Sequence, residues 1–173
     1  LNVPSGHYKV SGSGDYIFLL DASVSIIGEG AGNNGTVFSV CASADTDVFR
    51  ISPADASSPF TTFKGFRVEP DDGSTGGRDV LTIVTNAASQ IQRFVTEDLW
   101  LHAGAGYAIS GKDTDVSYST ACYYQSVIQR NVLYGQAGSS HFTQAGDSIA
   151  IVDNASPPVG NIGIYIEPVT GAA

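Results

Sequence analysis

The sequence predicts an all-β protein whose strands coil into a parallel β-helix, and a recurring short stretch is the first reason. Four stretches alternate apolar with other residues, beginning with FKGFRVEP at 63–70. Their apolar positions form two columns: Phe66, Leu99, Val132 and Ile164, then Val68, Leu101, Tyr134 and Ile166. Successive members are about 33 residues apart, a repeat length that is typical of a solenoid. Because alternation is the period of a half-buried strand, we expect both columns to point into one continuous core.

A second repeat indicates that each turn contains more than one strand. VLTIVTNAAS (80–89) is echoed by SIAIVDNAS (148–156), so that Ile83 matches Ile151 and Asn86 matches Asn154. Their spacing corresponds to two turns of about 34 residues. The intermediate copy is expected near Val116, where DVSYSTA is a weaker match.

The other expected strands are short and separated by turn signals. Alternating or apolar runs predict strands at Tyr16–Leu20, Val24–Ile27, Thr36–Val40 and Val48–Ile51. Glycine and asparagine clusters predict turns after the second of these strands, and 70–78 is too rich in glycine and aspartate to be an element. The stretch 118–129 is the one to weigh as a helix. Its aromatic residues do not keep a period of 3.6, which favours strand and turn.

Chain length, net charge and cysteine spacing limit the number of domains and the classes of partner that we expect. We expect one β-helix domain over 1–173, because 173 residues suffice for one core. We also expect this domain to belong to a longer chain. The net charge of −9, without a basic stripe, argues against a nucleic-acid partner, and no apolar run is long enough for a membrane span. Phosphate-loop and metal-ligand spacings are missing, so we expect no cofactor. Cys41 and Cys122 lie about two and a half turns apart at this period, and two buried free thiols are favoured over a disulfide.

The first turns carry a pattern that resembles a known family. Its residues are Pro4, Gly6, Tyr8 and Val10, then Val24, Ile26, Gly28 and Gly30, then Thr36 and Phe38. The pattern resembles the opening of pectate-lyase-like right-handed parallel β-helix proteins, most of all the phage tailspikes. At the repeat length described above the chain holds about five turns. The resemblance implies a homotrimer, and a place on a virion tail or outside the cell. It also implies binding, and in some members cleavage, of a bacterial surface polysaccharide.

Alternation places the residues between the core columns on the outer surface. Two outer rows are expected: Arg67, Trp100, Leu133 and Tyr165, and beside them Glu69, His102, Gly135 and Glu167. Aromatic rings offer flat apolar area for the C–H faces of sugars, and carboxylates accept hydrogen bonds from sugar hydroxyls. We therefore predict substrate-binding roles for Arg67, Trp100, Tyr165 and Glu167. Structural alternatives are a surface ion pair between Arg67 and Glu69, and a protomer contact at Trp100.

Glu69, Asp71 and His102 are the candidate catalytic residues. Glycoside hydrolysis uses two carboxyl groups, and inverting enzymes hold them about 6.5–9.5 Å apart. Glu69 and Asp71 are two residues apart, about 6.6 Å along a strand, and His102 is expected one turn above Glu69. The alternative for Asp71 is a role in the turn after Pro70, because Asp and Gly are common turn residues.

We predict that the chain is the β-helix part of a tailspike-like protein. Its predicted function is to recognise a bacterial surface polysaccharide, with cleavage of that polysaccharide as a further predicted activity. Two alternatives stay open at this stage. One is a structural or adhesive β-helix without catalysis. The other is a calcium-dependent polysaccharide lyase or epimerase, for which Asp71, Asp72 and Asp79 near Arg78 are a weak ligand set.

Overall fold

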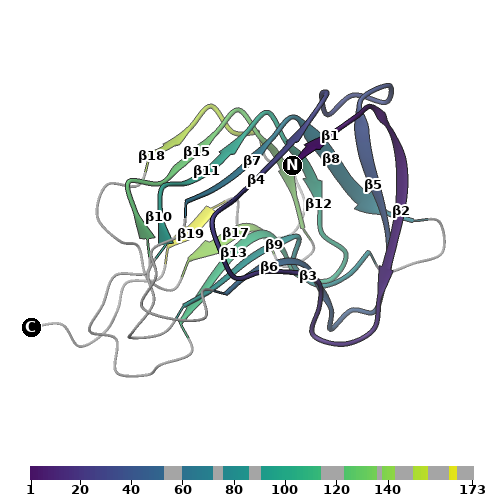
Figure 1. Ribbon diagram of the computed structural model, residues 1–173. Helices are drawn as coiled ribbons and strands as arrows, with labels where there is room; N and C mark the ends of the chain where they lie inside the picture. Colours follow the sequence, from purple (N-terminus) through teal and green to yellow (C-terminus); the bar gives the residue numbers. More distant parts are fainter. Residues whose placement is uncertain are drawn as a thin grey trace, which may run out of the picture.

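The computed structural model shows a chain that coils through three parallel sheets and forms a β-solenoid (Figure 1). It describes residues 1–52, 60–71, 76–85, 91–113, 123–135, 138–142, 150–155 and 164–166. Within these ranges the regular structure consists of β-strands, and no helix is long and apolar enough to cross a membrane. The predictions of an all-β fold and of parallel stacking are confirmed. The number of turns and their handedness stay predictions.

Each strand pairs in parallel with the equivalent strand of the next turn. Sheet 1 contains β1 (Asn2–Val3), β4 (Val24–Gly28), β7 (Thr61–Lys64), β11 (Phe94–Glu97), β15 (Val127–Gln129) and β18 (Ala150–Val152). Sheet 2 contains β2 (Gly6–Gly12), β5 (Thr36–Ala42), β8 (Phe66–Pro70), β12 (Trp100–His102) and β16 (Val132–Tyr134). Sheet 3 contains β3 (Tyr16–Leu20), β6 (Asp47–Ile51), β9 (Leu81–Thr85), β13 (Tyr107–Asp113), β17 (Gly138–Phe142) and β19 (Ile164–Ile166). A short pair, β10 (Ile91–Gln92) and β14 (Tyr123–Tyr124), forms a separate two-stranded sheet.

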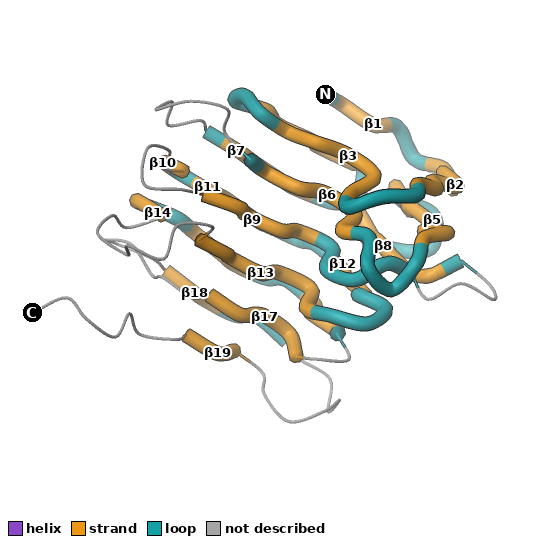
Figure 2. The backbone as a smooth tube through the Cα atoms, turned by 90° about the horizontal axis from the view of Figure 1, so that it is seen from below, coloured by secondary structure: helices purple, strands orange, loops and turns teal. Residues whose placement is uncertain are grey.

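Figure 2 shows the strands of sheet 3 lying side by side, so that segments from successive turns of the chain become neighbours. The strands predicted between Tyr16 and Ile51 occur where the sequence placed them. The stretch weighed as a helix contains β14 and β15 in its described part, so the strand and turn interpretation is confirmed there.

The core lies between the three sheets and is built from stacked aromatic and aliphatic side chains. Phe49, Phe63 and Phe66 are almost completely buried, and the Phe63 ring centroid lies 5.7 Å from that of Phe49 and 6.2 Å from that of Phe66. These tilted and edge-to-face contacts are the geometry that aromatic pairs prefer. In sheet 2, Phe38 pairs with Val68 and Val68 with Leu101, so the predicted inward column is confirmed for these turns.

The glycines of the opening pattern allow a close approach of the backbone at the corner between sheets 1 and 2. A Cβ atom on Gly28 would lie 2.5 Å from the carbonyl oxygen of Gly65, which leaves no room for any side chain. Gly30 has a φ of 113°, a conformation that favours glycine, and its N–H donates to Gly65 O at 2.7 Å. Thr36 is fully buried, and its hydroxyl accepts from the Glu29 N–H at 2.9 Å.

Further along, the same corner is held by the side chains of two asparagines. Asn131 is 1% exposed, its side-chain oxygen accepts from the Leu99 N–H, and its amide donates to the Thr96 hydroxyl at 3.0 Å. Asn154 repeats this arrangement one turn on, because its oxygen accepts from the Asn131 N–H at 2.9 Å and its amide donates to Ile128 O. These bonds satisfy backbone groups that the change of direction removes from the ladders.

The third copy of the repeat is shifted by one residue relative to the sequence alignment. Leu101 pairs with Leu133 and Trp100 with Val132, so Leu133 is buried and Val132 lies half-buried on the opposite side. The prediction that Val132 and Tyr134 point inward and Leu133 outward is therefore wrong. The step from Trp100 to its partner Val132 is one residue shorter than the step from Arg67 to Trp100. Because side chains alternate, the loss of one residue moves the whole copy to the other side.

The fourth copy of the repeat lies in a different sheet from the first three. Leu99 and Asn131, which are bonded across one turn, are 32 residues apart, whereas Asn131 and Asn154 are only 23 residues apart. Val132 accordingly forms a parallel bridge with Ala155, and Ser140 pairs with Ile164. Because the last turn is so much shorter than the repeat, Ile164 belongs to sheet 3 and does not stack on Val132.

The second sequence repeat is separated in the same way. Ile83 lies in β9 of sheet 3, whereas Ile151 lies in β18 of sheet 1, so the proposed stacking of these two segments is wrong. Asn86 and Val116 lie outside the described residues. Cys41 is a free, exposed thiol, which corrects the prediction that it is buried, and Cys122 also lies outside the described residues.

Candidate functional site

The outer surface of sheet 2 brings together four of the predicted site residues, and Arg67 is at their centre. Arg67 on β8 pairs with Trp100 on β12, and both side chains point away from the core. The Arg67 guanidinium carbon lies 4.1 Å from the centroid of the Trp100 ring, within the range of a cation–π interaction. Trp100 keeps 39% of its surface exposed, so part of the ring stays available for contact.

Glu69 and His102 form the neighbouring pair on the same surface. Glu69 makes an ion pair with Arg67. His102 follows Leu101 as Glu69 follows Val68, and Leu101 pairs with Val68, so the two side chains occupy adjacent positions. Burial lowers the pKa of His102 below its ordinary value; the Glu69 carboxylate acts in the opposite direction and Arg67 adds to the lowering. His102 therefore stays uncharged at neutral pH.

Tyr134 completes this surface, which we call the Arg67–Trp100 face: Arg67, Glu69, Trp100, His102 and Tyr134. Tyr134 pairs with His102 across β12 and β16, and their ring centroids are 4.1 Å apart in an edge-to-face arrangement. The sequence alignment places Tyr134 in the core, so sequence reasoning missed it as a site residue. The signal that could have found it is the one-residue shortening of the turn before β16.

Asp71 lies at the edge of this face. It directly follows β8, and its N–H donates to Val40 O at 2.8 Å, so the backbone continues along the sheet beyond Pro70. Its carboxylate makes an ion pair with Lys9, which is exposed. Glu69 and Asp71 are thus both paired with cations, and each is held as a hydrogen-bond acceptor on the outer side of sheet 2.

The two remaining predicted site residues are not part of this arrangement. Tyr165 lies in β19 of sheet 3, so its expected place in the row of Arg67 and Trp100 is wrong. The cause is the shortened last turn. Glu167 lies outside the described residues.

A polar pocket that sequence reasoning missed lies beside Arg67. It has a volume of about 310 Å³ and is lined by Ser5, Gly6, His7, Asn33, Asn34 and Gly35. The His7 Nε2 atom lies 3.1 Å from Asn33 O, and Arg67 donates to the Asn33 side-chain oxygen at 2.9 Å. In the sequence the cluster at 32–35 indicates only a turn between strands, and it carries no separate signal of a pocket.

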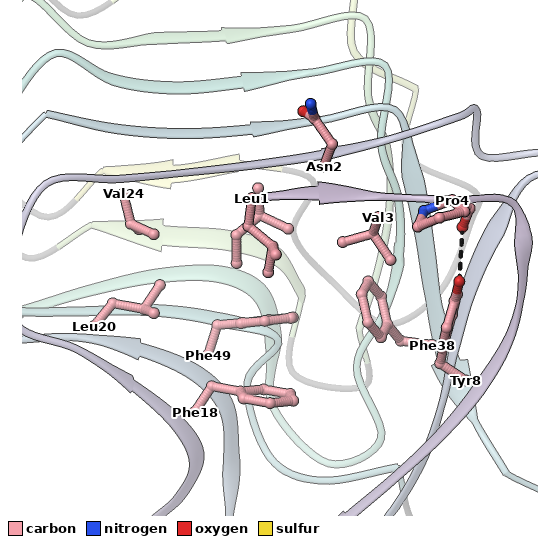
Figure 3. A pocket seen from close by; sticks show the side chains of 11 residues that line it. Leu1, Asn2, Val3, Pro4, Tyr8, Phe18, Leu20, Val24, Phe38 and Phe49 are labelled. Atoms are coloured by element: carbon pink, nitrogen blue, oxygen red, sulfur yellow. Dashed lines mark hydrogen bonds between the residues drawn. The ribbon is translucent and has the colours of Figure 1, made fainter.

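A second cavity, of about 400 Å³, opens at the end of the solenoid where β1 to β3 lie (Figure 3). Its lining is almost entirely apolar and includes Val3, Phe18, Leu20 and Phe49. The one interaction drawn there is the hydrogen bond from the Tyr8 hydroxyl to Pro4 O, at 3.1 Å. This cavity continues the hydrophobic core, and its lining has too few polar groups to orient a sugar.

The buried acidic residues hold the corner between sheets 2 and 3. Asp47 is fully buried and makes ion pairs of 2.8 Å with both Arg50 and Arg78. Asp79 is 2% exposed and accepts from the Ser110 hydroxyl at 2.7 Å and from the Tyr107 N–H at 2.8 Å. These ion pairs and hydrogen bonds compensate for the burial of the two carboxyl groups, so Asp47 and Asp79 have a structural role. Among the described residues no group of three or more His, Cys, Asp or Glu side chains is placed to hold a metal ion, and Asp72 lies outside them.

The described residues define a β-solenoid protein with an aromatic and ionic outer face on one sheet. No protein-family model, curated protein or solved structure matches the chain.

Proposed function

We propose that this β-solenoid binds a polysaccharide through the Arg67–Trp100 face. The observation that carries the proposal is the array in which Arg67 is held over Trp100 beside Glu69 and His102. A partly exposed indole offers flat area for the C–H face of a pyranose ring. The adjoining carboxylate, imidazole and phenol groups accept or donate hydrogen bonds to sugar hydroxyls. Because ion pairing and stacking restrain these side chains before binding, less entropy is lost when a ligand orders them.

The shape of the site suits an extended polymer. Neighbouring strands lie about 4.8 Å apart, so the outer positions of successive turns form rows along the solenoid axis. The resemblance of the opening turns to tailspikes supports a bacterial surface polysaccharide as the ligand, and a place on a virion tail or outside the cell. In the same proposal the solenoid is a right-handed β-helix of about five turns, and the parallel pairing of equivalent strands supports the β-helix architecture.

Cleavage of the same polysaccharide is the second candidate function. It is favoured by Glu69 and Asp71 lying two residues apart on one side of sheet 2, about 6.6 Å along a strand. That separation is within the range of inverting glycosidases. The uncharged His102 beside Glu69 supplies a further group for proton transfer. Binding remains the leading proposal because each carboxylate is paired with a cation, whereas a general acid must carry a proton.

A structural or adhesive β-helix without catalysis is the alternative from a different class, and the homotrimer that the resemblance implies bears on it. An outward Leu133 would have favoured burial of the Arg67–Trp100 face between protomers, and its place in the core removes that support. Apolar residues are exposed instead on sheet 1, where Ile27 is 38% and Val152 45% exposed. A trimer formed through sheet 1 would leave the Arg67–Trp100 face free, so association and polysaccharide binding are compatible.

Two matched variants test the binding proposal. Phe60 is an exposed aromatic residue with Arg93 over its ring at 5.4 Å, beside sheet 1, and thus reproduces the Arg67–Trp100 contact away from the site. Trp100→Ala should weaken binding to purified capsule or O-antigen polysaccharide by at least tenfold, and Phe60→Ala should leave it unchanged. Light scattering after gel filtration reports the oligomeric state of both. Equal affinity in the two variants, or dissociation of an oligomer by Trp100→Ala alone, would contradict the proposal.

The cleavage candidate has a separate readout. Glu69→Gln keeps the size of the side chain and a hydrogen-bond acceptor but cannot transfer a proton as a carboxyl group does. If Glu69 acts in hydrolysis, release of reducing ends should disappear while binding is retained. Release of reducing ends at the wild-type rate would exclude Glu69 from catalysis without affecting the binding proposal.

A further inference from the structure

The polar pocket at Ser5, His7, Asn33 and Asn34 lies at one end of the row that contains Arg67 and Trp100. On the outer side of sheet 2, His7 pairs with Val37, Val37 with Arg67, and Arg67 with Trp100. Three steps of about 4.8 Å place the His7 end of this row, in the pocket, roughly 14 Å from the Trp100 backbone along the solenoid axis. A short oligosaccharide in extended form covers that length. Val37 is fully buried, so a ligand would contact this row at His7 on one side and at Arg67 and Trp100 on the other.

Arg67 connects the pocket to the rest of the face. One of its terminal nitrogens donates to the Asn33 side-chain oxygen at 2.9 Å, another contacts Glu69, and its guanidinium lies over Trp100. The turn at 32–35 is thus fixed relative to the aromatic platform. Fixed spacing between two binding positions is what recognition of a polymer at successive units requires.

The side chains that line the pocket carry two amides, a hydroxyl and an imidazole, and they include no carboxylate, lysine or arginine. Such groups form hydrogen bonds in both directions with hydroxyl and acetamido substituents. The Glu29 carboxylate accepts from the Ser5 N–H at 2.9 Å. The two cations described on this surface, Arg67 and Lys9, are each paired with a carboxylate, and the chain carries a net charge of −9. A polyanionic glycan would therefore meet repulsion that these paired cations do little to offset.

We propose that the Ser5–Asn34 pocket is a second sugar subsite and that the polysaccharide which spans it and Trp100 is uncharged. This inference rests on the proposed function of the Arg67–Trp100 face. It assigns neutral hexose or N-acetylhexosamine units to the pocket, and it disfavours the uronate polymers on which calcium-dependent lyases act.

The first test uses an array of oligosaccharides divided into uncharged members and members bearing carboxylate, sulfate or phosphate. The wild-type protein should bind uncharged members, and binding should strengthen with chain length until the chain reaches from Trp100 to the pocket. Preferential binding of charged members would overturn the inference. Absence of binding to any member would overturn the proposed function as well.

The second test uses the best uncharged ligand and a short version of it in calorimetric titrations. His7→Ala combined with Asn34→Ala should reduce the affinity for the long chain about tenfold, the effect of losing one or two hydrogen bonds, and leave the short chain unaffected. Ser11→Ala, on the same strand and outer side as His7, is the matched control and should change neither. Trp100→Ala should weaken both. If the long chain binds the double variant as it binds wild type, while Trp100→Ala still weakens binding, the subsite is wrong and the proposed function stands.

Discussion

Leu133 provides the sharpest test of the register, because the sequence alignment and the structure place it on opposite sides of sheet 2. Leu133 is 1% exposed and pairs with Leu101, whereas Val132 is half-buried on the outer side and pairs with Trp100. Leu133→Ala removes three buried carbon atoms, worth about 2.4 kcal/mol at about 0.8 kcal/mol each. The backbone is held by the ladder to β12 and by the bond from the Leu133 N–H to Ala155 O, which limits relaxation. A cavity therefore remains and raises the expected loss to about 3–4 kcal/mol.

Val132→Ala is the matched variant at the neighbouring position. It removes two carbon atoms that are only partly shielded from water, so the expected loss is about 1 kcal/mol. Urea denaturation followed by tryptophan fluorescence measures both, because Trp100 is the only tryptophan and pairs directly with Val132. A loss for Val132→Ala equal to or greater than that for Leu133→Ala would refute the register and restore the sequence alignment.

Three further perturbations test other parts of the fold and site. Asn131→Ala leaves the buried Leu99 N–H without its acceptor and should cost about 1–3 kcal/mol in thermal or chemical denaturation. Gly28→Ala should destabilise by about 1–3 kcal/mol because its Cβ would clash with backbone, whereas Gly32→Ala, with nothing within 4 Å, should be neutral. Since the pKa of His102 is lowered in the folded state, the unfolded chain binds protons first, and stability should fall as the pH drops through about 6.5. His102→Gln should make the unfolding free energy less dependent on pH between about pH 7 and 5, and an unchanged pH dependence would contradict this assignment.

Local features of the sequence were enough to predict the type of fold and every residue of the Arg67–Trp100 face except Tyr134. Alternation over a few residues is a local property, and it correctly placed Val68 and Leu101 inside and Arg67 and Trp100 outside. The repeat step used in the alignment equals the true turn length between β8 and β12, so the alignment also brought Glu69 and His102 together. The glycines and threonine of the opening pattern were recognised as a motif, although the backbone contact at Gly28 that requires them appears only in three dimensions.

Alternation and a constant repeat length could not predict which segments stack on one another once the length of a turn changes. The turn of 32 residues from Leu99 to Asn131 moved Leu133 into the core and Tyr134 onto the site, and the turn of 23 residues from Asn131 to Asn154 preceded the transfer of Tyr165 to sheet 3. Turn length depends on loops whose paths are set by hydrogen bonds between distant residues, such as the bond from Arg67 to Asn33. The same loops form the pocket beside His7. Such contacts leave no periodic trace in the sequence. The positions of many strands could therefore be predicted along the chain, whereas the register and sheet of the later strands and the pocket could not.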